Sequence, residues 1–314
     1  MRIFYATDIH GSDICFRKFL NAAKVYNAEV LIMGGDITGK TITPIFRESS
    51  AYRCMLLGEE IAVHSNKGLE KLKKQIRDIG SYPYVTTRKG FDEILNDPQS
   101  KHKLFEDLIV ESIREWLKLA DEKLKNLEVE CYMSPGNDDS YIIDEVLKES
   151  KAVINPDSKV LEIRGGYEML SLGYANKTPW NCPRDISEDD LSRRLSKLSA
   201  QIKKYEVAIF NVHVPPYGTG LDEAPELDEN LRPKLEPGGR FKMIPVGSKA
   251  VREAITSLQP ILGLHGHIHE SKGFAKVGRT LCLNPGSEYQ EGILRGALLQ
   301  LDKGKMKDFI FTSG

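Results

Sequence analysis

Apolar residues in the first part of this chain form short runs that end in polar or glycine-rich turns. Residues 2–7 and 30–33 are two such runs, each of the length of a buried strand. Between them, apolar residues recur three and four positions apart, and Ser12 or Asp13 precedes them as a helix cap. Strand, helix and strand in this order favour parallel pairing in an α/β fold.

A long segment, residues 42–127, separates these strands from the next one, at 128–133. Most of it has a helical period, with apolar residues three and four apart over 69–79 and over 105–127. We therefore expect a single domain over residues 1–314, with a mostly helical insertion at 42–127 that packs on the core or covers a site.

The second half of the chain repeats the alternation of strands and helices. Strands are expected at 159–164, 168–172, 206–212 and 261–264, and helices at 187–204 and from residue 248 to before Pro260. A loop rich in proline and glycine at 215–247 is too long to be a simple connector, and loops of this kind are usually functional or mobile.

Composition narrows the classes of protein that fit. Of the 314 residues, 40% are hydrophobic and 28% charged, as in a globular protein, and the net charge of -1 excludes a strongly basic protein that coats nucleic acid. No apolar stretch approaches the roughly 20 residues that cross a bilayer, and none resembles a signal-peptide core, so we expect a cytoplasmic protein without a membrane partner. The five cysteines are scattered, which indicates reduced thiols.

Side chains that bind metals follow five of the expected strands. In chain order they are Asp8, His10, Asp36, Asn137, His213, His267 and His269. In open α/β sheets, ligands bind beyond the carboxyl ends of the strands, so we expect these side chains to meet in one region. Glycines next to several of them permit the tight turns that this requires.

These donors comprise two carboxylates, one amide and four imidazoles, without a thiolate. Such a set suits Mn²⁺, Fe or Zn²⁺ better than Mg²⁺ or Ca²⁺. It is too large for one tetrahedral site but sufficient for two ions that share a bridging carboxylate. We therefore expect two divalent metal ions, with Mn²⁺ favoured. Paired metal ions commonly catalyse displacement at phosphorus.

Five motifs follow one another along the chain: Asp8-x-His10, Gly34-Gly35-Asp36, Gly136-Asn137, the strand-end His213 and Gly266-His267-x-His269. In this order they resemble those of the calcineurin-like metallophosphoesterase superfamily. The turn Asn284-Pro285-Gly286-Ser287 also resembles one found in small bacterial and archaeal members. The resemblance implies an α/β fold, a two-sheet αββα sandwich. It also implies two ligand sets that share one carboxylate: Asp8, His10, Asp36 and His269 for the first metal, and Asp36, Asn137, His213 and His267 for the second.

The chain departs from the family pattern at one position. Asp138 follows Asn137 where the family usually has a histidine, which is commonly assigned as the acid to the leaving oxygen. Asp138 is therefore a candidate acid, and His265 or His10 could instead hold a donor water. The resemblance further implies that Asn137 and His213 position and polarise the phosphoryl group.

The sequence thus predicts a metal-dependent phosphoric ester hydrolase that attacks a phosphodiester or phosphomonoester with a metal-activated water. We expect a small phosphate ester, because the charge balance provides no strong steering toward a polyanion such as nucleic acid. Two alternatives stay open. One is a metal-dependent nuclease, and the other is a weakly catalytic interaction or regulatory scaffold on the same fold.

Overall fold

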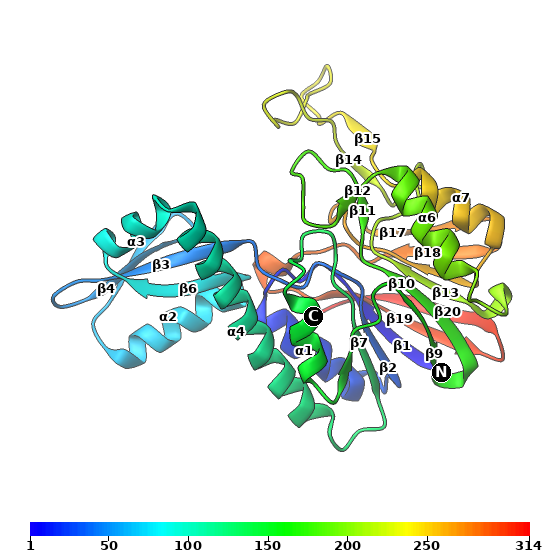
Figure 1. The fold of residues 1–314 in the computed structure, drawn as a ribbon, viewed down its shortest axis with the longest axis horizontal. Helices are drawn as coiled ribbons and strands as arrows, with labels where there is room; N and C mark the ends of the chain where they lie inside the picture. The colour runs from blue at the N-terminus through cyan, green and yellow to red at the C-terminus, as the bar shows by residue number, and fades with distance from the viewer.

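Two six-stranded sheets face each other in the computed structural model, which describes residues 1–314 (Figure 1). The first sheet has the order β20 (Lys305–Ser313), β19 (Arg295–Asp302), β1 (Arg2–Ala6), β2 (Val30–Met33), β7 (Glu130–Met133) and β8 (Val153–Ile154). The second has the order β17 (Gly273–Val277), β18 (Thr280–Asn284), β16 (Leu262–Leu264), β13 (Ile209–Val212), β10 (Tyr167–Leu172) and β9 (Lys159–Ile163). The central strands of both sheets run parallel, as the alternation of strands and helices predicts.

The central strands of each sheet are buried on both faces, and this explains why the sequence of β1 is almost wholly apolar. Successive side chains of a strand point to opposite faces. Ile3 and Tyr5 pack between the two sheets, whereas Phe4 and Ala6 pack on the other face, under the helices.

Helices cover both outer faces. α1 (Asp13–Val25), α4 (Pro98–Leu124) and α5 (Ile143–Val146) pack on the first sheet, and α6 (Glu188–Ser199) and α7 (Lys249–Leu258) pack on the second. Ser12 caps α1 as expected, because its side chain accepts a hydrogen bond from the Cys15 backbone N–H. The predicted two-sheet αββα sandwich is confirmed. None of the helices is both long and apolar enough to span a bilayer.

A smaller lobe projects from this body, at the left of Figure 1. It contains β3 (Thr41–Arg47), β4 (Tyr52–Leu56), β5 (Glu59–Val63), α2 (Asn66–Asp78), β6 (Ser81–Thr86) and α3 (Arg88–Leu95). Its four-stranded sheet, in the order β5-β4-β3-β6, was not predicted from the sequence. The sheet packs on α2 in a small hydrophobic cluster, and only two strand residues of that cluster, Ile45 and Cys54, are fully buried. The strands therefore have little hydrophobic pattern in the sequence.

The long helix α4 belongs to the main body and not to the lobe. Its apolar face, which includes Ile109, Ile113 and Trp116, joins the core cluster under the first sheet. The Trp116 ring stacks on Phe16, with the ring centroids 4.3 Å apart. The part of the expected insertion 42–127 that stands apart from the body therefore ends near residue 95.

Two short pairs of strands lie near the upper end of the sandwich in Figure 1. β11 (Ala175–Asn176) pairs with β12 (Asp185–Ile186), and β14 (Glu223–Pro225) pairs with β15 (Met243–Pro245). The second pair gives the expected long loop at 215–247 a hairpin structure of its own.

Candidate metal centre

The loops that follow five strands, from both sheets, bring the expected metal-binding side chains together. β1 leads to Asp8 and His10, β2 to Asp36, β7 to Asn137, β13 to His213, and β16 to His267 and His269. Asp8, His10 and His269 form one group, and Asp36, His213 and His267 form another; in each, one ligand atom per residue lies within 4.8 Å of the others.

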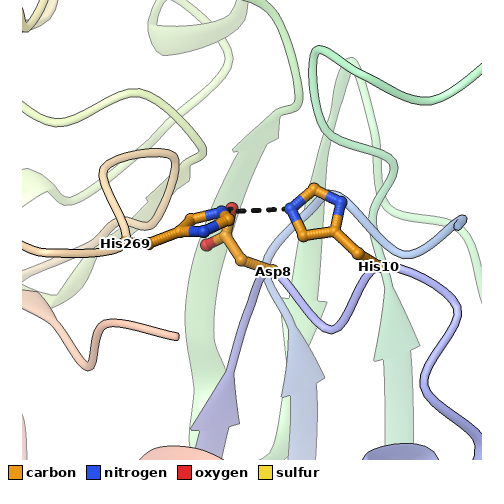
Figure 2. A group of neighbouring side chains, drawn as sticks. All are labelled: Asp8, His10 and His269. Atoms are coloured by element: carbon orange, nitrogen blue, oxygen red, sulfur yellow. Dashed lines mark hydrogen bonds and ion pairs between the residues drawn. The ribbon is translucent and has the colours of Figure 1, made fainter. Parts of the chain in front are cut away.

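Distances between the donor atoms show how the two groups adjoin. The Nε2 atoms of His10 and His269 are 3.0 Å apart, and His269 Nε2 lies 3.5 Å from Asp8 Oδ1 (Figure 2). His213 Nε2 lies 3.4 Å from Asp36 Oδ1 and 3.8 Å from Asp8 Oδ1. The two carboxylates are therefore next to each other, with an imidazole from the second sheet beside both.

The backbone at the cluster is held in an uncommon conformation. Asp8, His10, Asp36 and His267 have φ angles of 54°, 38°, 48° and 68°, in the left-handed region that non-glycine residues rarely adopt. Backbone hydrogen bonds hold two of them in place: Asp8 donates to the carbonyl oxygen of Gly35, and His10 donates to that of Asp36. Such conformations persist where the surroundings over-determine them, and they gather at functional sites.

Two motif glycines are required because side chains of the cluster lie against their backbone. A Cβ atom on Gly136 would stand 2.2 Å from Asp36 Oδ1, and one on Gly266 would stand 2.3 Å from Asp8 Oδ2. No side chain fits at these distances. The two glycines thus allow a loop from one strand to approach the carboxylate that follows another strand.

Comparisons with known proteins agree with this geometry. No family model matches the chain. MJ1162, an uncharacterized protein of Methanocaldococcus jannaschii, is 32% identical over 169 residues, which are 52% of this chain and 68% of MJ1162. The chain belongs to the same family as MJ1162.

Solved structures show which fold this family has. TT1561 of Thermus thermophilus is 14% identical with a TM-score of 0.56, and the match covers 100% of this chain and 97% of TT1561. A second structure is 18% identical with a TM-score of 0.55, over 98% of this chain and 97% of its own. The fold is that of the calcineurin-like metallophosphoesterases, as the motifs predicted.

Within this fold, the charges at the cluster favour a cation. Burial lowers the pKa of His10 and of His267 to about 4, so both imidazoles are neutral at pH 7 and offer a lone pair. Burial alone would also lower the pKa of His213, but the Asp36 and Asp8 carboxylates raise it to about 9. Positive charge next to these two carboxylates is therefore stabilised.

Three buried atoms of the cluster have no hydrogen-bond partner, which fits a metal site. They are His10 Nδ1, Asn137 Oδ1 and His213 Nε2. Buried polar atoms normally have partners, and these three are of the kinds that bind divalent ions. The donor set thus fits two metal ions on observations that are independent of the motif resemblance.

The orientation of the Asn137 amide depends on Asp185, which the sequence analysis missed. Asn137 Nδ2 donates to Asp185 Oδ1 at 3.0 Å, so that Asn137 Oδ1 is left for another ligand. The other oxygen of Asp185 accepts from the backbone N–H groups of Thr178 and Cys182, both at 3.0 Å. No local signal marks Asp185, because it follows Asn137 by 48 residues and only the fold brings the two together.

Asp138, the candidate acid, lies at the edge of the cluster, where it forms an ion pair with Lys40. Its other oxygen accepts a hydrogen bond from the Cys182 thiol at 2.8 Å. Burial alone would lower the pKa of Lys40, but Asp36 and Asp138 raise it above its ordinary value, so the ammonium stays charged. Sequence reasoning also missed Lys40, because one lysine after a turn is usually solvated.

His265 belongs to neither group of donors. Its Nδ1 lies 2.7 Å from the carbonyl oxygen of Val212, within the second sheet. The structure therefore does not support the alternative in which His265 holds a donor water at the cluster.

A buried arginine holds the loop that carries Asn137 and Asp138. Arg184 is fully buried, and its Nε donates to the carbonyl oxygen of Asp139 at 3.0 Å. Its Nη2 is 3.0 Å from Asp144 Oδ1, and its Nη1 is 3.6 Å from Asp157 Oδ2. These two carboxylates balance the buried guanidinium, so the loop is anchored by a paired charge.

Proposed function

We propose that this protein is a metal-dependent phosphoric ester hydrolase with two divalent metal ions at the cluster, Mn²⁺ being favoured. The observation that carries the proposal is the pair of adjoining groups of His and Asp donors, each with its ligand atoms within 4.8 Å. In the proposed site, Asp8, His10, Asp36 and His269 hold the first ion, and Asp36, Asn137, His213 and His267 hold the second.

The proposed chemistry is hydrolysis of a phosphodiester or phosphomonoester. When bound, two such ions lower the pKa of a water molecule and neutralise phosphoryl oxygens. The neutral imidazoles of His10 and His267 supply lone pairs, and Asp185 keeps Asn137 Oδ1 directed to the site. We propose that Asn137 and His213 also position the phosphoryl group, and that Asp138 acts on the leaving oxygen.

A small phosphate ester is preferred over nucleic acid as the substrate, because the net charge is -1. We also propose that residues 1–314 form one domain and that the protein is cytoplasmic.

The two alternative functions predict different results. A nuclease would bind DNA with a steep dependence on salt, and a weakly catalytic scaffold would bind metals without turnover.

The test is a panel of phosphomonoesters, phosphodiesters and pyrophosphates, assayed with added Mn²⁺, together with the metal content of the protein. We expect two ions per chain in the wild type. Asp36→Asn should weaken metal binding at both positions and lower the rate at least about a hundredfold, since the proposal makes this carboxylate common to both. The control is His64→Asn, on the exposed part of the lobe. Two tightly bound ions and a near-normal rate in Asp36→Asn would contradict the proposal.

A further inference from the structure

An apolar groove of about 510 Å³ lies between the lobe and the first turns of α4. Its apolar lining residues come from β3, α3 and α4: Ile42, Phe91, Ile94, Leu95, Leu104 and Phe105. Lys40, Lys101 and His102 also line it, and no carboxylate does. The groove therefore combines an apolar wall with positive charge.

Helix α3 contributes an apolar face that the rest of the chain covers only in part. Phe91, Ile94 and Leu95 are three and four residues apart, so they lie on one side of the helix. No residue of α3 is buried, and Leu95 is 48% exposed. An amphipathic helix whose apolar side stays partly open is typical of a binding surface.

The groove adjoins the metal centre through Lys40. Lys40 lines the groove and forms an ion pair with Asp138. Asp138 in turn lies next to His10 and Asp36: one ligand atom of each of these three residues lies within 4.8 Å of the others. A second contact joins the same parts, because Glu106 of α4 accepts a hydrogen bond from Ser140, two residues after Asp138. A ligand in the groove would thus lie beside Lys40, whose ammonium pairs with a residue at the edge of the cluster.

A second cavity, of about 420 Å³, adjoins the cluster at His269 and differs in chemistry. Only one of its eleven lining residues is hydrophobic, and its charged residues are Glu270, Glu288 and Glu291 with Lys272 and Arg295. The carboxylates outnumber these two cations, whereas the groove at Lys40 has only cations among its charged residues. The groove therefore suits a molecule with a phosphate at one end and an apolar chain at the other better than the second cavity does. Its lysines match the phosphate, and its apolar wall matches the chain.

We propose that the substrate is a phosphate ester of an extended apolar alcohol, with the alcohol in this groove and its phosphate beside Lys40. This rests on the proposed function and specifies its substrate class. Hydrolysis would form a bond between phosphorus and the water oxygen and break the bond between phosphorus and the alcohol oxygen. The attacking water loses a proton and the alcohol oxygen gains one, so that the alcohol and phosphate are released.

The experiment compares two phosphonates that cannot be hydrolysed, dodecylphosphonate and ethylphosphonate, in calorimetric binding to the Mn²⁺-loaded protein. We expect dodecylphosphonate to bind at least about tenfold more tightly, because its additional methylene groups leave water. Leu95→Asp should abolish this preference and leave ethylphosphonate binding unchanged. The matched control is Met55→Asp, in the same lobe and 61% exposed, which does not line the groove and should keep the preference.

Other results would overturn the inference in distinguishable ways. Both phosphonates could bind equally, or neither could bind detectably, while two Mn²⁺ stay bound and short esters are still hydrolysed. That result would contradict the proposed apolar alcohol but not the proposed phosphoesterase activity. Failure of the protein to bind Mn²⁺ would contradict the proposed function itself. A change from dimer to monomer in Leu95→Asp, measured by sedimentation, would show that a second copy of the chain covers the groove.

Discussion

Gly136 and Asp36 lie so close together that a single methyl group would displace the carboxylate. The Cβ of Gly136→Ala would stand 2.2 Å from Asp36 Oδ1 and 2.3 Å from the Asp36 backbone nitrogen. We expect this variant to lose about 1–3 kcal/mol of unfolding free energy, as overpacked sites do, and to bind Mn²⁺ more weakly.

Gly273→Ala is the control for that substitution. Its Cβ would meet only Leu221 Cδ2, at an ordinary 3.5 Å. Calorimetry and urea unfolding of both variants check the prediction. Similar metal affinity in the two would mean that the Asp36 carboxylate is not needed where the structure places it.

The hydrogen bond from Asn137 to Asp185 predicts a second effect on metal affinity. Asp185→Ala frees the Asn137 amide to rotate, and the loss of such a supporting contact typically costs about 10–100-fold in metal affinity. The exposed Asp189→Ala removes a nearby carboxylate of the same chemistry and should have little effect. If both variants bind Mn²⁺ like the wild type, Asp185 does not orient Asn137.

Asp138 and its ion pair with Lys40 lead to a prediction about leaving groups. If Asp138 acts on the leaving oxygen, Asp138→Ala should slow alkyl phosphate esters by about 10²–10⁴-fold and nitrophenyl esters much less, because nitrophenolate departs without a proton. Measuring kcat/KM for both classes tests this. Equal slowing of the two classes would remove Asp138 from the proton transfer, and Lys40→Gln would then show whether the ammonium acts in its place.

Among the elements, α4 was the easiest helix to predict and the hardest to assign to a part of the molecule. Its period identifies it in the sequence, but the period does not say which surface it packs on. The structure shows that Trp116 stacks on Phe16 and donates from Nε1 to Asp13 Oδ1 at 2.6 Å. The long helix is therefore part of the hydrophobic core of the main body. Replacing all of residues 42–127 by a short loop would remove that part of the core.

The two tryptophans of the chain provide a direct check on the position of α4. Trp116 is 3% exposed, whereas Trp180 is 64% exposed. Trp116→Ala should lower the free energy of unfolding by about 3–5 kcal/mol, and Trp180→Ala should change it by no more than about 0.5 kcal/mol. Equal effects in urea unfolding would contradict the assignment of α4 to the core.

How much the sequence predicted differs between the body and the lobe. Strands such as Val30–Met33 are buried on both faces, so their apolar runs were predicted with the correct bounds. In the lobe, β3 contains Pro44 and only Ile45 is buried, so neither its composition nor its pattern indicates a strand. The donor residues were predictable because they directly follow strands, but Asp185 and Lys40 contribute only through tertiary contacts.

For the whole molecule, the cysteines give a prediction that is independent of the metal centre. All five are free, and burial raises the pKa of Cys131 and of Cys282 to about 12. Cys182 is partly exposed, but burial together with its hydrogen bond to Asp138 raises its pKa to about 12 as well. We therefore expect the native protein to react slowly with a thiol reagent at pH 8, and the unfolded protein to react at all five positions.

The sign of the pH dependence follows from the same shifts. The pKa of these thiols is higher in the folded chain than the value of about 8.5 in the unfolded one, so their contribution to stability is complete below pH 8.5 and is lost as the pH rises toward 12. Counting labelled thiols in native and unfolded samples at pH 8 checks the predicted difference in reactivity. Rapid labelling of Cys182 itself in the native protein would contradict its raised pKa.

The origin of the cluster in both sheets has a mechanical consequence. Asp8, His10 and Asp36 stand on loops of the first sheet, and His213 and His269 stand on loops of the second. Ions bound among them would cross-link the two halves of the sandwich at its rim. Each ion that binds only the folded chain adds to its stability in proportion to the logarithm of the ion concentration. The same ions that are proposed to serve hydrolysis would therefore also resist the separation of the sheets.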